Sequence, residues 1–348
     1  MSTPATEGGT AEKAGRDRRF QAPKLPRPRI PRRDRGLLRE EEVVPWSVGD
    51  RIGLVAAWFC GLLLCAIAAA IVIYMLVRGL QYVNLSAIGQ HPIVQSTTTI
   101  TGTSGGYLDP IEGTLILTTL GILIALPIGV ATAVWLSEYG RPSWLARAVE
   151  SGVEIVAGTP TIVLAIFGLL IFSKGIFGFL SFTAQGGAVF GRSFFIAGIM
   201  MSLIALPLVV GSTREALQSI PAHVREASYA LGKDKISTIR RVLLPASRKG
   251  IATGATLGMG RIAGDTAIVV ILLGASLTLQ PYGNAPLVGT LRGTGSTLTS
   301  FVYANSPAGE GNSPTKAYAA AFVLLVIVIL MNFAVDLFSR QRSDPWAR

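Results

Sequence analysis

The chain has 348 residues, of which half are hydrophobic and only 15% are charged, and its mean hydropathy is +0.51. Soluble domains carry about a quarter charged residues, so this composition excludes an ordinary soluble protein and favours a polytopic membrane protein. The net charge of +11 does not indicate nucleic-acid binding, because the basic residues gather ahead of the first apolar run, without RNA-binding signatures or zinc-ligand spacings.

Residues 1–50 are rich in Pro, Arg and Glu and show no apolar periodicity. We predict a disordered, basic cytoplasmic tail that lies against anionic lipid. The apolar run over residues 51–80 predicts the first transmembrane helix, and the long polar stretch ahead of it argues against a cleaved signal peptide. Cys60 and Cys65 fall in this run with side chains pointing in different directions, so we interpret them as packing residues rather than a disulfide.

Six stretches of the sequence are long and apolar enough to cross a membrane, for which about 20 residues are needed. The fifth stretch along the chain, 250–276, contains two ionisable residues. The stretches are 52–77, 113–137, 155–173, 193–213, 250–276 and 317–335. We therefore predict an all-α polytopic membrane protein with six transmembrane helices, the last five forming one transmembrane domain over residues 113–338.

Lysine and arginine placement predicts the orientation of these spans. If both termini are cytoplasmic, 25 of the 31 basic residues lie in inner segments and 5 in outer segments, with Arg261 inside a span. Inner loops of membrane proteins carry such an excess. We therefore expect a multi-pass protein of the cytoplasmic membrane with both termini inside.

The run Gly186-Gly-Ala-Val-Phe-Gly-Arg-Ser193 nearly matches a nucleotide-binding P-loop. We reject that function, because Arg192 replaces the phosphate-binding lysine, no strand is expected before it, and the orientation places it outside the cell. ATP hydrolysis would then reside on a separate subunit, so this chain is not expected to be an enzyme.

The inner segment 214–249 predicts a pair of short cytoplasmic helices. Ser219 is expected to cap the first helix and Gly232 to end it, while Asp234 caps a second helix that Pro245 stops. The second helix carries an apolar stripe made by Ile236, Ile239, Val242 and Leu243. Short helices with apolar and charged faces suit a docking element, although an amphipathic pair lying at the membrane interface is an alternative.

Residues 226–228 read Glu-Ala-Ser, Gly232 follows after three residues, and Val242-Leu-Leu-Pro245 after nine more. This spacing resembles the EAA signature of ABC importer permeases, with Ser and Val as mild departures. The resemblance implies a type I ABC importer permease fold, in which this loop is the coupling helix that contacts a separate ATPase. The residues to which it assigns that contact are Glu226, Ala227, Gly232, Leu244 and Pro245.

Three further segments resemble the permeases of phosphate (Pst) importers, more the PstA type than its sister PstC. They are residues 118–139, residues 156–168, and Gly260-Arg-Ile-Ala-Gly-Asp-Thr266, which is similar to an R-x-x-G-E-T pattern with Asp for Glu. The resemblance implies a subunit without a cofactor that passes inorganic phosphate. The partners it implies are a PstB-like ATPase dimer, a PstC-like second permease and an external PstS-like phosphate-binding protein.

Arg261 and Asp265 are ionisable residues inside a predicted span, where each costs about 2.5 to 3.5 kcal/mol. An arginine fork suits two phosphate oxygens, and a carboxylate can accept a hydrogen bond from the protonated oxygen that phosphate keeps and sulfate lacks. Thr266 can add a hydroxyl donor. We predict that these three residues line the substrate pathway. The alternative is a self-neutralised pair, because residues four apart share one helix face.

Other functions remain open at this point. The same kind of importer could carry sulfate or molybdate, and a secondary transporter driven by an ion gradient is a more distant alternative. Such transporters tend to show internal repeats with paired broken helices, and the sequence shows no repeat. His91 and His223 are too few and too far apart to predict a metal site.

Overall fold

The computed structural model describes residues 47–83, 88, 106–140, 143–181, 191–274, 286–307, 309 and 313–340. The chain divides into two compact units, residues 1–65 and 66–348, which are considered separately. The regular structure of the described residues is helical, which confirms the predicted all-α class. The predicted basic tail lies almost wholly outside them.

The first helix, α1 (Val48–Tyr82), covers the predicted span 51–80 and begins at a reciprocal cap. The Ser47 hydroxyl accepts from the Asp50 amide at 3.1 Å, and the Asp50 carboxylate accepts from the Ser47 amide at 3.0 Å. The two cysteines are free, and both are exposed among the described residues, so their predicted packing role stays a prediction. Within the second unit, Gly79 near the end of α1 packs against Phe322.

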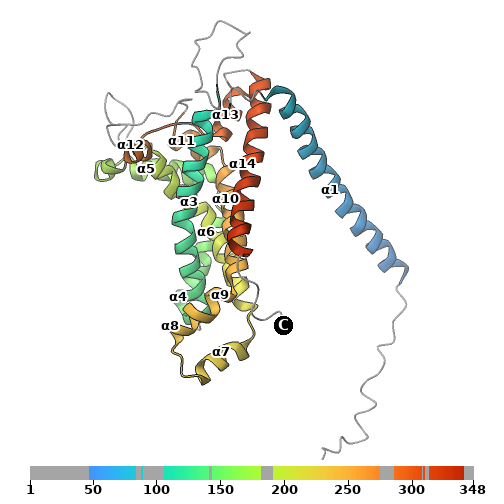
Figure 1. The fold of residues 1–348 in the computed structure, drawn as a ribbon, viewed down its shortest axis with the longest axis vertical. Coiled ribbons are helices and arrows are strands. Elements are labelled where there is room, and N and C mark those ends of the chain that lie inside the picture. The colour runs from blue at the N-terminus through green and yellow to red at the C-terminus, as the bar shows by residue number, and fades with distance from the viewer. Residues whose placement is uncertain are drawn as a thin grey trace, which may run out of the picture. The chain divides into compact units, whose positions relative to one another are not determined.

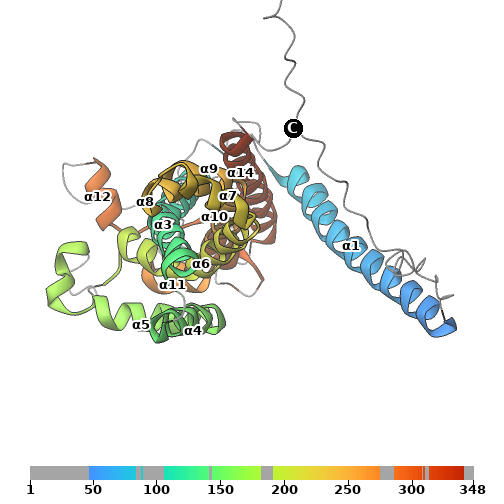
Figure 2. The ribbon, with the colours of Figure 1, turned by 90° about the horizontal axis from the view of Figure 1, so that it is seen from below.

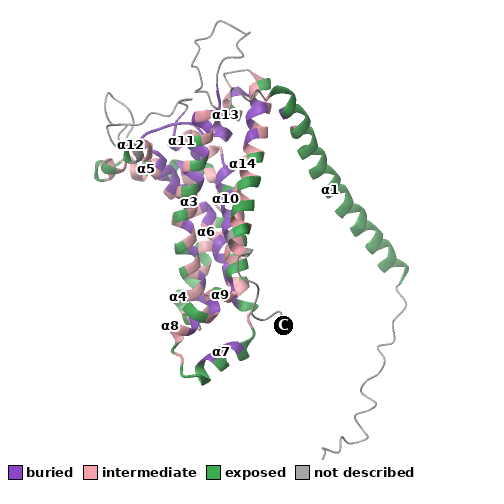
Figure 3. Ribbon diagram, viewed as in Figure 1, coloured by how far each residue is buried: buried purple, intermediate pink, exposed green. Residues whose placement is uncertain are grey.

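The body of the second unit is a bundle of long helices. They are α3 (Leu108–Val134), which ends in the π turn η2 (Trp135–Tyr139), α6 (Phe194–Gln218), α10 (Arg248–Ala263) and α14 (Pro314–Arg340). Helices α3, α6 and α10 pack along one another, and α14 lies against α10 (Figures 1 and 2). Buried residues gather where these helices meet (Figure 3).

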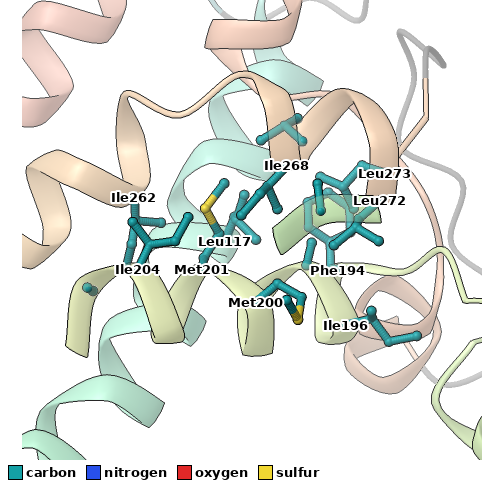
Figure 4. Close-up of a cluster of buried hydrophobic side chains, with 14 of the residues drawn as sticks. Leu117, Phe194, Ile196, Met200, Met201, Ile204, Ile262, Ile268, Leu272 and Leu273 are labelled. Atoms are coloured by element: carbon teal, nitrogen blue, oxygen red, sulfur yellow. The ribbon is translucent and has the colours of Figure 1, made fainter. Parts of the chain in front are cut away.

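The largest apolar cluster lies between α6, α3, the end of α10 and the short helix α11 (Ala267–Leu272). Figure 4 shows Met201 of α6 and Leu117 of α3 beside Ile262 and Ile268, which lie on α10 and α11 respectively. All four side chains are almost fully buried. This cluster therefore fixes the position of the α10–α11 connection against α3 and α6.

Glycines spaced by four residues bring α10 close to α6. A Cβ atom on Gly254 would lie 3.1 Å from the Val209 Cα, and one on Gly258 would lie 3.3 Å from the Ala205 Cβ. Small residues at this spacing allow close helix contact in membranes. Gly254 and Gly258 therefore allow close packing of the two helices, whereas a Cβ on Gly260 or Gly264 would meet no other helix.

The Gly254→Val substitution is expected to destabilise the protein by about 1 to 3 kcal/mol, because the added methyls would force α10 away from α6. The measurement is thermal unfolding in detergent. Gly211→Val is the matched control, since a Cβ on Gly211 of α6 would meet nothing within 4 Å. Equal melting temperatures for the two variants would contradict the close helix contact.

The third predicted span, 155–173, is not one continuous helix, and its crossing of the membrane stays a prediction. The chain forms α4 (Trp144–Gly158) and α5 (Thr161–Phe172), with a bend of 107° between them. The reason is Pro160, which has no amide hydrogen and restricts the residue before it. Thr159 accordingly adopts an extended conformation, with φ −77° and ψ 130°.

The fifth predicted span, 250–276, is also interrupted. Helix α10 ends at Ala263 and α11 begins at Ala267, so Gly264, Asp265 and Thr266 form a break. Among the described residues, four helices are long and apolar enough to cross a membrane, or five if the bent α4–α5 pair counts as one span. The predicted total of six spans therefore stays a prediction.

The remaining described elements are short. Outside the segment between α6 and α10, they are η3 (Gly175–Leu180), α12 (Pro286–Arg292) and α13 (Leu298–Asn305). Helix α13 begins at a capping box formed by Thr297 and Ser300. The P-loop-like run 186–193 lies outside the described residues except for its end, where the Ser193 hydroxyl accepts from Ile196 and caps α6.

Candidate functional site

The predicted docking element lies at one end of the bundle, the lower end in Figure 1. It consists of α7 (Ala222–Ala230), α8 (Lys235–Thr238), the π turn η4 (Ile239–Leu243) and α9 (Leu244–Ala246). Helix α7 begins after Pro221 rather than at Ser219. The Ser219 hydroxyl instead donates to the Ala216 carbonyl at 2.9 Å at the end of α6, so its predicted capping role is wrong.

Gly232 ends the first helix, as the sequence predicts, and has a φ of +73°. Its amide donates to the Tyr229 carbonyl at 2.9 Å, and the Lys233 amide donates to the Ser228 carbonyl at 3.2 Å. This is the Schellman pattern, in which a left-handed residue satisfies the last helical carbonyls. Only glycine adopts this conformation without strain, so Gly232 determines where the chain turns toward α8.

Helix α7 has a buried side and an exposed side. Val224 and Ser228 are buried, and the Ser228 hydroxyl lies 2.8 Å from the Thr238 hydroxyl of α8. Serine at the third position of the EAA-like motif therefore joins the two short helices. Glu226 and Ala227 lie exposed, in the position that contact with another protein requires.

The second helix keeps its predicted start but not its predicted end. Asp234 occupies the N-cap position of α8, and the helix runs on through η4 into α9 without stopping at Pro245. The wider π turn accommodates the proline within the helix. Ile239 and Leu243 of the predicted stripe are buried against Leu217, and an exposed Ile236 projects away from the bundle. Leu244 is half-buried and Pro245 is exposed.

An ion pair that the sequence analysis missed connects this loop to η2, at a residue directly after the second predicted span (113–137). The Arg225 guanidinium of α7 contacts the Glu138 carboxylate of η2, with Nε and Oε1 3.1 Å apart. The Glu138 side chain is only 7% exposed. These two residues, with Ser137 and Gln218, line a groove of about 460 Å³. Glu138 lies within the segment that resembles phosphate permeases, and this is the one signal that could have indicated it.

The predicted pathway residues lie at the break between α10 and α11. An Arg261 guanidinium nitrogen is 3.9 Å from Asp265 Oδ2, which makes an ion pair but not a hydrogen bond. The Arg261 side chain is 47% exposed, whereas that of Asp265 is 3% exposed. The arginine therefore presents its donors outward from a buried carboxylate. Thr266 is half-buried and occupies the N-cap position of α11.

Asp265 is held in place by two further contacts. Its Oδ1 atom accepts from the Ile268 amide at 3.0 Å, and its carbonyl accepts from the Thr299 hydroxyl of α13 at 3.1 Å. The carboxylate thus caps α11 with one oxygen and faces Arg261 with the other. The Oδ2 atom makes no direct hydrogen bond with the guanidinium and lies 3.9 Å from it.

Helix α10 connects the two sites. It begins next to α9 and ends next to Asp265, and its 16 residues span about 24 Å. The structure therefore brings Arg261, Asp265 and Thr266 together, and it groups Glu226, Ala227 and Gly232 at the other end of the helix.

The sequence from residue 125 to residue 344 matches the family described as "Binding-protein-dependent transport system inner membrane component". The chain is 32% identical over 246 residues to "Phosphate transport system permease protein PstA 1" of Mycobacterium tuberculosis (strain ATCC 25618 / H37Rv), covering 70% of this chain and 73% of that protein. It is 29% identical over 249 residues to "Phosphate transport system permease protein PstC" of Xylella fastidiosa (strain 9a5c), covering 68% and 72%.

A solved structure supports the fold. The chain resembles a subunit in the crystal structure of "a bacterial ABC transporter involved in the import of the acidic polysaccharide alginate", with a TM-score of 0.55. The match covers 84% of this chain and 98% of that one, at 18% sequence identity. At this identity the likeness concerns the fold alone, and it confirms the predicted ABC permease fold.

Proposed function

We propose that this chain, which belongs to the family of binding-protein-dependent transport system inner membrane components, passes inorganic phosphate across the membrane under the control of a separate ATPase. Family membership makes it a multi-pass permease of an ABC importer and a transport subunit rather than an enzyme. The substrate, the coupling residues and the named partners are the proposed part.

Phosphate is the proposed substrate for two independent reasons. Relatives at 32% and 29% identity carry the name of phosphate transport permeases. The break between α10 and α11 also places an exposed guanidinium beside a buried carboxylate. A guanidinium recognises two phosphate oxygens at once, and the carboxylate oxygen facing it accepts a hydrogen bond from the protonated oxygen of monohydrogen phosphate. Sulfate has no such proton and would be repelled.

The EAA-like loop is the proposed ATPase contact, and its geometry carries the proposal. Helix α7 is short, is ended rigidly by Gly232, and keeps Glu226 and Ala227 exposed at the end of the bundle. We assign the contact to these three residues together with Leu244 and Pro245. The assembly then holds two PstB-like ATPase subunits, a PstC-like second permease and a PstS-like external phosphate-binding protein, with this chain as the PstA-like permease.

The orientation follows from the same proposal. An ATPase in the cytoplasm requires α7 and α8 to be cytoplasmic, which agrees with the excess of basic residues on that side. Both termini are then cytoplasmic, and the α10–α11 break faces the outer part of the membrane.

The proposed function can be tested by purifying the tagged chain from cells that express it with its neighbouring genes. The complex is placed in lipid nanodiscs, and ATP hydrolysis is measured with the external binding protein loaded with phosphate or with sulfate. We expect the ATPase to co-purify and phosphate alone to stimulate hydrolysis. Stimulation by sulfate alone would show that the substrate is sulfate and not phosphate. Absence of the ATPase from the purified complex would contradict the coupling role.

A further inference from the structure

The EAA-like loop is covalently joined to two of the long helices but not to α3. Helix α6 leads into α7, and α9 leads into α10, so movement of the loop reaches both through the chain itself. Helix α3 lies 80 or more positions earlier in the sequence and depends on non-covalent contacts. Its end at η2 contacts the loop through Val134, which packs in the apolar cluster of Leu217, Ile239 and Leu243, and through the side chain of Glu138.

The contact of Glu138 with Arg225 is directional and nearly buried. Nε and one terminal nitrogen of Arg225 each lie 3.1 Å from Glu138 Oε1. The two terminal nitrogens also donate to the carbonyls of Ile220 and Leu217, each at 2.8 Å. Leu217 belongs to the last turn of α6, where carbonyls have no helical partner. One guanidinium therefore joins α7 to the ends of both α6 and the α3–η2 helix.

A second basic residue contacts the same point from the other short helix. Lys235 of α8 donates to the carbonyl of Glu138, and its ammonium lies 4.3 Å from the centre of the Tyr139 ring. Helices α7 and α8 thus contact Glu138 through its carboxylate and its carbonyl respectively. These contacts fall on a π turn, a feature that often marks functional sites in helices.

We propose that Glu138, Arg225 and Lys235 form a clasp through which the coupling helices move the second predicted span. The inference rests on the proposed coupling of this loop to an ATPase. It assigns Glu138 as the positioning residue on the span and Arg225 and Lys235 as its two partners on the loop. The exposed side of α7 is left to the ATPase. In this arrangement one movement of the loop is passed to α3, α6 and α10 together, which a rigid-body tilt of the bundle requires.

A charged clasp suits this task better than apolar contact alone. Apolar side chains can slide past one another with little loss of contact, because the hydrophobic effect has no direction. A carboxylate held by a guanidinium fork is fixed in direction, and separating the pair would leave a charge in a site that is only 7% exposed. The clasp is therefore expected to stay closed while the loop moves.

The test uses the complete complex with its ATPase, second permease and binding protein, reconstituted in liposomes. Four variants are compared: Glu138→Gln, Arg225→Gln, the double variant of these two, and Lys235→Gln. ATPase co-purification, stimulated ATP hydrolysis, and phosphate transported per ATP hydrolysed are measured for each. Transport is expressed per assembled ATPase, so a lower yield of complex does not affect the comparison.

We expect each single variant to keep the ATPase bound and to hydrolyse ATP within about twofold of wild type. Phosphate transported per ATP should fall by about 2- to 30-fold, the range in which single contacts modulate coupling between sites. The double variant should transport as much phosphate per ATP as the single variant with the larger loss, because both substitutions remove the same contact. Lys235→Gln should lower the phosphate transported per ATP by less than Glu138→Gln or Arg225→Gln does.

The matched control is Glu150→Gln, which breaks an ion pair of 2.5 Å between α4 and α6 that does not involve the coupling helices. Its transport ratio should equal that of wild type. An unchanged ratio in Glu138→Gln would overturn the clasp, and so would loss of ATPase binding in parallel with transport. Failure of the wild-type complex to bind the ATPase or move phosphate would instead overturn the proposed function, so the two failures are distinguishable.

Discussion

Arg261→Ala is expected to lower phosphate uptake at subsaturating phosphate by about 10- to 150-fold. Hydrogen bonds to charged groups contribute about 1.5 to 3 kcal/mol, and each 1.4 kcal/mol is a factor of ten in affinity. The guanidinium is 47% exposed beside a carboxylate that is 3% exposed, so its removal leaves a buried negative charge without its partner on the proposed pathway of an anion. The measurement is initial uptake rate against phosphate concentration, per assembled complex.

Arg261→Lys is the informative companion variant. Lysine keeps the positive charge but not the planar fork, so we expect an intermediate uptake rate with a raised half-saturating phosphate concentration. If the pair serves only to hold α10 against α11, the alanine variant would melt at a lower temperature yet transport phosphate normally per assembled complex. That outcome would return Arg261 and Asp265 to a structural role.

Gly232→Pro is expected to abolish association with the ATPase while leaving membrane insertion intact. The residue has a φ of +73°, whereas proline is locked near −65° and has no amide hydrogen to donate to Tyr229. The cost of about 3 kcal/mol or more falls on a turn outside the bundle, where a Cβ would meet nothing within 4 Å. Co-purification of the ATPase with tagged chain is the measurement.

Gly232→Asn separates loss of the turn from loss of glycine itself. Asparagine tolerates the left-handed conformation and keeps the amide donor, so this variant should bind the ATPase nearly as wild type does. Normal ATPase binding by the proline variant, or equal loss by both, would show that the turn at Gly232 does not position the docking helix.

Local patterns in the sequence predicted those parts of the structure that depend on local physics. Apolar runs located α1, α3, α6 and α14, and the turn at Gly232 followed from the conformation that helix ends favour. The helix breaks at Pro160 and at Gly264 were missed, because a run of apolar residues measures burial in lipid and not backbone continuity. Proline after threonine was a signal for the first break that the apolar run obscured.

The contacts between distant segments could not be predicted in the same way. Glu138 and Arg225 are 87 positions apart, and nothing in either local segment specifies the other. The hydrogen bond from Thr299 to the Asp265 carbonyl joins residues 34 positions apart for the same reason. Arg261 and Asp265 were candidates because they are ionisable residues in an apolar run. Their unequal burial could not be predicted, because it depends on the helix break at Gly264, which leaves the arginine exposed and the aspartate buried.

Uptake of labelled phosphate tests the central claim most directly. The recipient cells lack their own high-affinity phosphate importer and express this chain with its neighbouring genes, in the presence of excess sulfate. We predict ATP-dependent phosphate uptake that sulfate does not reduce and that disappears when the ATPase gene is omitted. Good expression of the assembled complex without phosphate uptake, or uptake that persists without the ATPase, would contradict the account.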